Sequence, residues 1–379
     1  MEKFVELIQR VHKERFSVVM NKIVAEKIPV AFLSLETTNN AINAANNFCK
    51  QGVNVIALIT LDTTPPTDLN TDFEILHIDK FLRLPLRPKY IFVDDATAAR
   101  FAVQYISDCT LLYPIYRNTE AIYNTFMEHL TDLQEVYESL IDEESKKTFC
   151  GYWLSSITER FGEIVYTNTQ HYILNGFIPE RNSILIDVGA YDGGTATFFS
   201  EMGYKVYAFE MDTKNFERAK KISEGKNFVI ENMGLGSYEH EMRYKSNGSI
   251  SQFDPNGSEV AKVTTLDAYV RRNKIPRVDF IKFDVEGAEL DVLKGATTVI
   301  AQFKPILAIS AYHKWDDFWT LMKFVKSIRP DYEFAMRQYR SSLEDLPPSD
   351  FNLYIENMLY SLGLDVKECW YNECVLFAR

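Results

Sequence analysis

The sequence predicts an α/β protein with two domains, each built around a parallel sheet. With 379 residues, the chain is longer than one ordinary domain. Short apolar runs alternate along it with segments of helical pattern, which is typical of parallel α/β layers. A hydrophobic fraction of 46% with 25% charged residues is that of a globular protein, so we expect both domains to be folded.

The first domain is predicted over residues 1–115 as a smaller Rossmann-like unit. Its strands are expected at 29–34, 53–60, 73–77 and 90–93, and its helices at 39–51 and 96–106. The first strand-to-helix turn, SLETTNNA from Ser34, has no glycine, so its backbone cannot come close to a pyrophosphate. We therefore expect a scaffold, or an oligomerisation domain that makes the chain a homo-oligomer. The alternative is a domain that recognises a sugar or nucleotide, with Asp94 and Asp95 as candidate residues.

A helical bridge is predicted over residues 116–180. Apolar side chains recur there at helical spacing between Ile122 and Leu140. Such a segment would pack one α/β unit on the other.

The second domain, residues 181–379, opens with SILIDVGAYDGGTATFFSEMGYKVYAFE from Ser183 to Glu210. The run 184–188 is continuously apolar apart from Asp187, as expected of a strand buried on both faces. A glycine-rich turn follows, then a helix capped by Thr195 or Thr197, then a strand at 205–209 that ends on Glu210. This is the general layout of a nucleotide-type cofactor site.

The residues of the glycine-rich turn favour S-adenosylmethionine over NAD. Its spacing is G-x-x-x-G-G, with Tyr191 where a dinucleotide fingerprint has its second glycine. Asp187 and Asp192 would repel a pyrophosphate. S-adenosylmethionine carries a sulfonium and an ammonium and no phosphate, so an acidic turn attracts it. Glu210 is placed to accept hydrogen bonds from both ribose hydroxyls.

Polar residues stand at the ends of successive predicted strands of this domain. They are Asp187, Glu210, Asn232, Asp284 and His313. Ligands of open α/β sheets bind beyond the carboxyl ends of the strands, so these side chains are expected at one edge. Each of them alone would more often be a helix cap or a turn residue, and Glu286 would equally well favour a helix N-terminus.

The second domain resembles the FkbM family of S-adenosylmethionine-dependent methyltransferases. The resemblance rests on DVGAYDGGT at Asp187, FEMD at Phe209, ENMGLG at Glu231, TTLDAYV at Thr264, IKFDVEGAELDVLKGA at Ile281 and ISAYHKWDDFW at Ile309. It covers roughly the last 200 residues. It implies a seven-stranded class I methyltransferase fold that acts on hydroxyl oxygens of sugars or secondary metabolites.

The resemblance also implies roles for individual residues. Asp187, Gly189 and the following turn would face the methionine end of the cofactor, Glu210 its ribose and Asp284 the transferred methyl group. The turn of Asn232 and Met233 would lie near the adenine. The full set expected to bind the cofactor is Asp187, Gly189, Ala190, Tyr191, Asp192, Gly193, Thr195, Glu210, Met211, Asn232, Met233 and Asp284.

Methyl transfer to oxygen also needs an aligned acceptor and a group that takes its proton. Among the strand-end residues, His313 has a side chain with a pKa suited to this task. We expect His313 to be the base or to position the acceptor, with Asp284 or Glu286 as assistant or alternative base. Asp284, Glu286 and Glu289 lie close in sequence, but on a helix start they would point in different directions, so no metal site is predicted.

Composition argues against several other partners. The formal net charge is −12 and the basic residues are scattered, so nucleic acid is not an expected substrate. The start, MEKFVELIQRVHKERF, has the pattern of a charged amphipathic helix, and no run of about 18 apolar residues follows, so membrane insertion is not expected. Five scattered cysteines without metal-type spacing are expected to be reduced, which favours a cytoplasmic location.

The sequence thus predicts an S-adenosylmethionine-dependent O-methyltransferase for a small hydroxylated acceptor, most plausibly a saccharide or glycan precursor. Methylation of a nitrogen is a rival within the same class. A binding module that holds cofactor or a partner without turnover is the alternative from another class. An NAD-dependent dehydrogenase is disfavoured by Tyr191.

Overall fold

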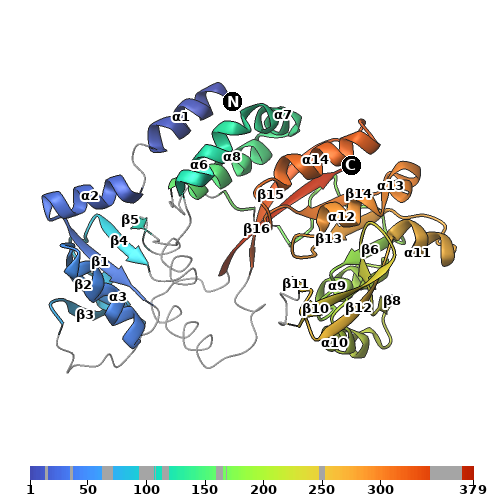
Figure 1. The fold of residues 1–379 in the computed structure, drawn as a ribbon, viewed down its shortest axis with the longest axis horizontal. Helices are drawn as coiled ribbons and strands as arrows, with labels where there is room; N and C mark the ends of the chain where they lie inside the picture. Colours follow the sequence, from blue (N-terminus) through green and yellow to red (C-terminus); the bar gives the residue numbers. More distant parts are fainter. Residues whose placement is uncertain are drawn as a thin grey trace. The chain divides into compact units, whose positions relative to one another are not determined.

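The computed structural model describes residues 1–12, 16–34, 37–61, 71–93, 106, 108–112, 119–158, 165–167, 169–246, 252–341 and 369–379 (Figure 1). The chain forms two compact units that interleave in sequence. Unit 1 contains Met1–Leu130, Lys147–Tyr166 and Arg340–Tyr371, and unit 2 contains Thr131–Lys146, Thr167–Tyr339 and Asn372–Arg379. Asp94, Asp95 and the helix expected at 96–106, except Ile106, lie outside the described residues.

Unit 1 is built on a five-stranded sheet in the order β3-β2-β1-β4-β5. Every neighbouring pair in it is parallel. The strands are β1 (Pro29–Leu33), β2 (Asn54–Thr60), β3 (Glu74–His77), β4 (Tyr90–Val93) and β5 (Thr110–Leu112). The helices before and between them are α1 (Glu2–His12), α2 (Phe16–Glu26), α3 (Asn39–Lys50) and α4 (Ile78–Leu82).

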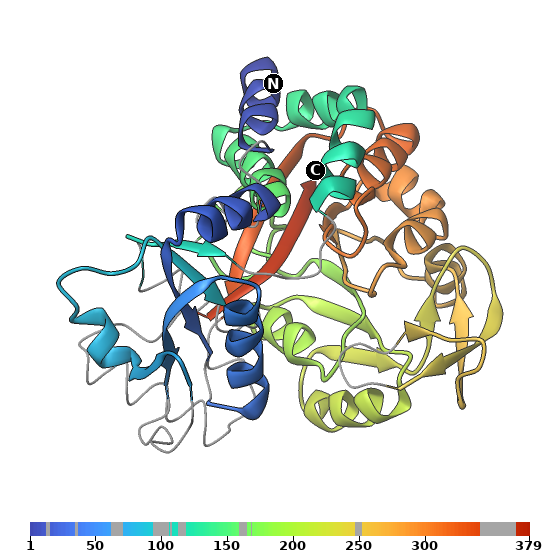
Figure 2. The ribbon, with the colours of Figure 1, turned by 60° about the vertical axis from the view of Figure 1, so that its left-hand side comes forward.

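The turn between β1 and α3 has a local structural role. The Thr38 side chain caps α3 by accepting a hydrogen bond from the Ala41 backbone N–H at 3.1 Å. The Thr37 hydroxyl donates to the Thr60 hydroxyl at 3.1 Å. Residues of α3 such as Ile42 and Ala45 then pack into the core of the sheet (Figure 2, blue). The hydroxyls of Thr37 and Thr38 therefore have partners within unit 1.

The segment expected as a helical bridge, residues 116–180, is helical only up to Thr158 among the residues described. It contains α6 (Thr119–Glu128), α7 (Leu130–Ser139) and α8 (Glu143–Thr158). The start of α8 is tied to the sheet of unit 2, because Arg337 donates to both carboxylate oxygens of Asp142 at 3.0 and 3.2 Å and to the Ser145 hydroxyl at 2.7 Å. The remainder of α8 belongs to unit 1.

Unit 2 is built on a seven-stranded sheet in the order β15-β16-β14-β13-β6-β7-β8. The five strands from β14 to β8 are parallel, and β16 is antiparallel to β14. The strands are β6 (Ile184–Val188), β7 (Lys205–Phe209), β8 (Phe228–Glu231), β13 (Phe280–Phe283), β14 (Ile306–Ser310), β15 (Phe334–Ser341) and β16 (Cys369–Ala378). Every residue of β6 and β13 is buried, as their apolar runs predict.

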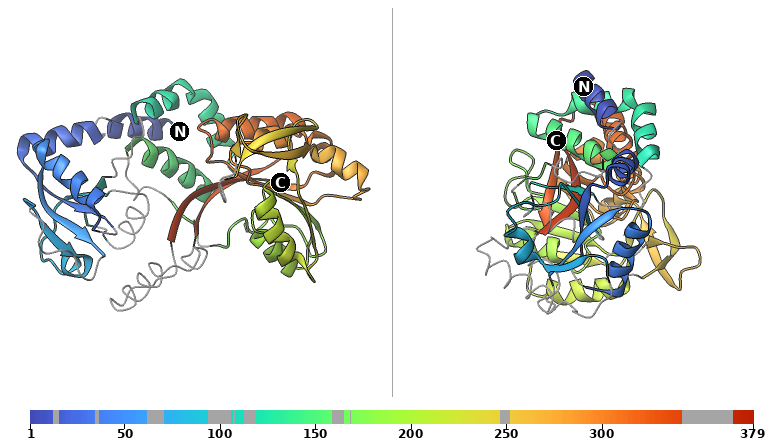
Figure 3. Two further views of the ribbon diagram at one scale, coloured as in Figure 1. Left: turned by 60° about the horizontal axis from the view of Figure 1, so that its bottom comes forward. Right: turned by 90° about the vertical axis from the view of Figure 1, so that its left-hand side faces the viewer.

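Helices lie on both faces of this sheet (Figure 3, left). On one face are α9 (Gly194–Glu201) and α10 (Thr213–Ser223). On the other are α11 (Leu266–Arg272), α12 (Glu289–Lys294), α13 (Thr297–Phe303) and α14 (Asp317–Ile328). The N-cap of α9 is Gly193, with φ of 86° and no capping side chain. The expected cap at Thr195 or Thr197 was therefore wrong, because the helix begins one residue before Thr195.

A second, smaller sheet in unit 2 has the order β11-β10-β12-β9. Its strands are β9 (Gly234–Leu235), β10 (His240–Lys245), β11 (Gln252–Phe253) and β12 (Glu259–Thr264). The mixed α/β class with parallel sheets is thus confirmed. No helix among the described residues combines the length and the apolar character that crossing a membrane requires.

Candidate active site

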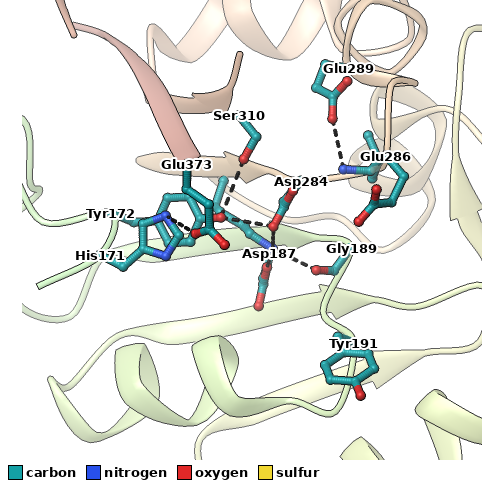
Figure 4. Close-up of polar contacts among 12 residues, drawn as sticks. His171, Tyr172, Asp187, Gly189, Tyr191, Asp284, Glu286, Glu289, Ser310 and Glu373 are labelled. Atoms are coloured by element: carbon teal, nitrogen blue, oxygen red, sulfur yellow. Dashed lines mark hydrogen bonds and ion pairs between the residues drawn. The ribbon is translucent and has the colours of Figure 1, made fainter. Parts of the chain in front are cut away.

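The carboxyl ends of β6, β7, β13 and β14 bring the expected polar residues of unit 2 to one edge of the sheet. Asp187 lies near the end of β6, Glu210 and Asp284 directly follow β7 and β13, and His313 lies in the turn after β14. Figure 4 shows how close Asp187, Asp284 and Glu286 lie to one another. This edge is where ligands of open parallel sheets bind.

Gly189 is required by a close approach between the turns after β6 and β13. Its φ is 80°, and a Cβ placed on it would lie 1.8 Å from the carbonyl oxygen of Asp284. The Asp284 backbone N–H also donates to the Val188 carbonyl at 3.0 Å. Only glycine fits such a position, so the first glycine of the turn locks two loops of the site together.

Asp187 forms a buried ion pair with a residue that sequence reasoning missed. Its Oδ1 lies 3.1 Å from Lys282 Nζ, and the two side chains are 0% and 3% exposed. Lys282 also donates to the Gly189 carbonyl at 2.6 Å. Burial alone would lower the pKa of Lys282, but the carboxylates of Asp187, Asp284 and Glu210 raise it above its ordinary value. The lysine is therefore a fixed positive charge among the acids.

This pair corrects the electrostatic argument made from the sequence. Asp187 was expected to attract the cationic cofactor, but most of its charge is offset by Lys282. The other carboxylates of the edge are those of Glu210, Asp284 and Glu286, which are not paired with Lys282 as closely as Asp187 is. Lys282 Nζ lies 4.0 Å from Asp284, compared with 3.1 Å from Asp187.

Asp284 is held by two tyrosine hydroxyls. Tyr172 donates to its Oδ2 at 3.0 Å, and Tyr312 donates to its Oδ1 at 3.4 Å. Lys282 Nζ lies 4.0 Å from the same Oδ2 and 5.5 Å from the centroid of the Tyr172 ring. Tyr172 is buried, and its φ of 60° lies in the left-handed region. The residue that holds Asp284 therefore has a strained backbone.

A histidine and a glutamate flank Tyr172 on its far side. The His171 ring stacks on Tyr172, with centroids 3.8 Å apart. Its Nε2 lies 3.1 Å from Glu373 Oε2 in β16 (Figure 4). This contact ties the segment before β6 to the strand that ends the chain.

His313 lies among three carboxylates. Its Nδ1 is 2.9 Å from Glu289 Oε1, and its Nε2 is 3.6 Å from Glu286 Oε2 and 3.7 Å from Asp284 Oδ1. Burial by itself would lower the pKa of His313, but these three acids raise it above its ordinary value. The structure therefore brings together all three residues expected to carry the chemistry, His313, Asp284 and Glu286.

Glu210 receives two backbone hydrogen bonds. The Tyr191 N–H donates to its Oε2 at 2.8 Å, and the Asp212 N–H donates to its Oε1 at 2.7 Å. Burial nevertheless raises the pKa of Glu210 to about 7. Tyr191 has a φ of 49°, so this tyrosine adopts the backbone conformation usual for glycine at the position where a dinucleotide fingerprint has one.

Other residues expected at the cofactor have structural partners of their own. Asp192 Oδ1 accepts a hydrogen bond from the Gly194 N–H at 3.0 Å, at the start of α9. Asn232 donates to the carbonyls of Glu210 and Met211 at 3.1 and 3.3 Å, and so fixes the turn after β7. Among the rest, Ala190 and Gly193 are buried, and Thr195, Met211 and Met233 are half-buried.

The sequence argument gave no role to several residues of this site, among them Lys282, Tyr172 and Glu289. Lys282 left a signal, because a lysine in a buried apolar strand requires acidic partners. Tyr172 left none, since it lies 112 residues before its partner Asp284 in an irregular segment.

A known protein family matches the part of the chain that contains most of these site residues. Residues 187–343 match the family model described as Methyltransferase FkbM domain. This stretch is an FkbM methyltransferase domain. It includes Lys282, Asp284, Glu286 and His313, whereas Tyr172 precedes it and Glu373 follows it.

Two similar proteins place the FkbM domain in context. Hexuronic acid methyltransferase AglP of Haloferax volcanii is 30% identical over 128 residues, which are 32% of this chain and 53% of that protein. The chain therefore spans about half the length of this curated relative. The crystal structure of a methyltransferase FkbM from Methylobacillus flagellatus KT matches 100% of this chain and 98% of its own, with a TM-score of 0.62 and 18% identity. That likeness concerns the fold, and it includes both units.

Proposed function

We propose that the chain transfers a methyl group from S-adenosylmethionine to a hydroxyl oxygen of a small, sugar-derived acceptor. In this proposal unit 2 is a class I methyltransferase domain, and unit 1 is a Rossmann-like accessory domain that can also mediate self-association. The observation that carries it is the edge of the sheet where Glu210, Asp284 and His313 converge behind the turn at Gly189.

The residues at this edge fit a cationic cofactor. The carboxylates at this edge outnumber its cationic side chains Lys282 and His313, so their field favours a sulfonium and an ammonium. Glu210 stands at the end of β7 with a carboxylate that has room for further donors, as ribose binding requires. When bound, S-adenosylmethionine supplies an electrophilic methyl group on its sulfonium.

The chain's own residues then have to orient the acceptor and manage its proton. Asp284 is fixed by Tyr172 and Tyr312, which makes it a rigid group beside the acceptor. Nε2 of His313 faces the same space from the end of β14. In our proposal His313 takes the acceptor's proton or positions the acceptor, and Asp284 or Glu286 serves as assistant or alternative base.

The acceptor class follows from chemistry and from one relative. AglP is described as acting on a hexuronic acid, and this chain resembles it over part of its length. A sugar acid or a neutral hydroxylated sugar is therefore the first class of acceptor to test.

Ligand binding separates this proposal from its rivals. Stabilisation by S-adenosylmethionine and S-adenosylhomocysteine, but not by NAD, is the expected result of a thermal-shift experiment on the full chain. Stabilisation by NAD alone would instead identify a dehydrogenase. Binding of S-adenosylmethionine without a methyl-sized mass gain on any hydroxylated sugar or amine would favour a non-catalytic binding module.

His313 provides the sharpest test of the chemistry. His313→Ala is expected to retain S-adenosylhomocysteine binding and to lose most turnover, since removal of a positioned acid–base group typically costs about 100-fold or more. A matched control is His240→Ala, which removes an exposed histidine from β10 of the smaller sheet. Equal turnover in the two variants would remove His313 from the mechanism.

A further inference from the structure

The His313 imidazole divides the surrounding carboxylates into two sets. Its side chain is 9% exposed, so it is more than nine-tenths buried. Nδ1 faces Glu289, and Nε2 faces Asp284 and Glu286. The two nitrogens can therefore have different tasks.

Neither ring nitrogen of His313 meets hydrogen-bond geometry with the residues that the structure describes. Nδ1 nevertheless lies 2.9 Å from Glu289 Oε1, whereas no such short distance to a described residue exists for Nε2. The oxygens nearest to it, on Glu286 and Asp284, lie 3.6 and 3.7 Å away, beyond hydrogen-bond reach. Two ligand atoms that each lie about 2.1 Å from one metal ion are about 3.0 to 3.4 Å apart. This nitrogen therefore lies a few tenths of an ångström farther from each oxygen than two ligands of one cation would lie from each other.

Glu289 is placed to hold the imidazole for such a role. Its side chain is 1% exposed, and its Oε1 lies 2.9 Å from His313 Nδ1. The Val285 N–H donates to the same oxygen at 3.0 Å and fixes it. A histidine that binds a metal usually donates its other ring N–H to a carboxylate in this way, which fixes the tautomer and points the free nitrogen at the ion.

We propose that Nε2 of His313 and the carboxylates of Asp284 and Glu286 bind a divalent metal ion, with Glu289 orienting the histidine. One donor atom from each of Asp284, Glu289 and His313 lies within 4.8 Å of the others, and His313 Nε2 lies 3.6 Å from Glu286 Oε2, so an imidazole and three carboxylates are gathered here. Two carboxylates and one imidazole favour Mg²⁺ or Mn²⁺ over thiophilic ions. The remaining positions of the ion are open to oxygens of a ligand.

This site deepens the proposed function, on which its role in turnover depends. Asp284, Glu286 and Glu289 would repel the carboxylate of a sugar acid. A divalent cation reverses the local charge, and it can bind the carboxylate and a hydroxyl of one acceptor together. His313 was left with two roles, to take the acceptor's proton or to position the acceptor. A metal at this site favours the second, because His313 would then position the acceptor through the metal. This proposal departs from the expectation, made from the sequence, that the site contains no metal.

Mn²⁺ alone is a suitable probe, because its binding is measured without turnover. Isothermal titration of the full chain with MnCl₂, followed by electron paramagnetic resonance of the bound ion, should reveal one site per chain. Glu286→Gln removes a ligand charge and keeps the side chain's shape, so we expect its Kd for Mn²⁺ to rise at least tenfold. Asp284→Asn should behave alike, and it provides a second variant if the first does not fold.

Glu201→Gln is the matched control. Glu201 is an exposed glutamate at the end of α9 that pairs with Lys226, and its variant should bind Mn²⁺ like the natural protein. The inference is overturned if the natural protein does not bind Mn²⁺ at millimolar concentration. It is also overturned if Glu286→Gln and Glu201→Gln bind Mn²⁺ equally well.

A parallel titration with S-adenosylhomocysteine separates this inference from the proposed function. Binding of S-adenosylhomocysteine without Mn²⁺ binding would refute the metal site and leave the methyltransferase proposal intact. Binding of Mn²⁺ without S-adenosylhomocysteine would support the metal site and refute the methyltransferase proposal.

Discussion

Lys282 Nζ and Asp187 Oδ1 lie 3.1 Å apart in the centre of unit 2, on the adjacent strands β13 and β6. Both side chains are almost fully buried. The pair joins the strand that delivers Asp284 to the strand that leads into the turn at Gly189. A buried ion pair therefore links the two strands that lead into the candidate active site.

Removal of the lysine should be costly. Lys282→Met leaves Asp187 as an uncompensated buried charge, so we expect a loss of about 3 to 5 kcal/mol in the free energy of unfolding. Adding Asp187→Asn should restore part of this loss. Urea unfolding of both single variants and the double variant measures the coupling. The control, Lys226→Met, breaks the exposed pair with Glu201 and should cost about 1 kcal/mol or less.

The close approach at Gly189 predicts a strong effect of one methyl group. Gly189→Ala combines a left-handed backbone with a Cβ 1.8 Å from the Asp284 carbonyl, so the two loops must separate. We expect a loss of about 2 to 4 kcal/mol in unfolding free energy, together with loss of S-adenosylhomocysteine binding.

Gly203→Ala is the matched control for Gly189→Ala. Its φ is 95°, but a Cβ there would meet no atom within 4 Å. It should cost only the backbone strain, about 1 to 2 kcal/mol, and leave binding intact. Equal losses in both variants would show that the contact with Asp284 is unimportant.

Glu210 predicts a pH dependence of cofactor binding. Its pKa is raised to about 7 by burial, and ribose hydroxyls donate more strongly to the ionised carboxylate. Affinity for S-adenosylhomocysteine should therefore fall about tenfold between pH 8 and pH 6. In Glu210→Gln the affinity should be lower at pH 8 and nearly independent of pH over this range, which calorimetry can measure.

Ionisation of Glu210, which should strengthen cofactor binding, lowers the stability of the folded protein. A carboxyl whose folded pKa is raised holds its proton more tightly in the folded protein than in the unfolded chain. The stabilisation that the bound proton provides is complete below pH 4.5 and is lost as the pH rises through about 7. Glu210→Gln should lack this loss of unfolding free energy.

The prediction for cofactor binding has its own contradicting outcome. A tenfold fall in affinity for S-adenosylhomocysteine in both the natural protein and Glu210→Gln would assign the pH dependence to another group.

Tyr172 predicts a change in function as well as in stability. Tyr172→Phe removes the hydroxyl that donates to Asp284 Oδ2, a hydrogen bond to a charged acceptor worth about 1.5 to 3 kcal/mol. We expect turnover to fall at least tenfold, because Asp284 becomes free to move. The measurement is kcat and KM together with unfolding free energy.

The control for Tyr172 is Tyr332→Phe. Tyr332 donates to the Pro305 carbonyl at 2.7 Å, outside the site residues described above. This variant should lose stability without losing turnover. If the two variants had the same turnover, Tyr172 would have only a structural role.

Much of the secondary structure could be predicted because it is determined locally. The strands at Tyr90–Val93 and Lys205–Phe209 occur with the predicted bounds, and the helices at Thr213–Ser223 and Leu266–Arg272 begin at local capping residues. Asp212 caps the first of these helices and Thr265 the second. The spacing of apolar residues, the capping residues and the glycines that end helices each determine the structure of only a few neighbouring residues. These signals can therefore be recognised in one sequence.

The sequence by itself determined which polar residues stand at the strand ends, and parallel strands bring those ends to one edge. Only the tertiary structure decided their partners. Strand pairing sets Lys282 beside Asp187, the segment before β6 sends Tyr172 to Asp284, and the turn after β14 brings His313 to Glu289. These pairs depend on register and packing between elements far apart in sequence, which no local pattern encodes. The glycine-rich turn therefore supports the proposed cofactor class, and the packing around it supports the proposed metal site.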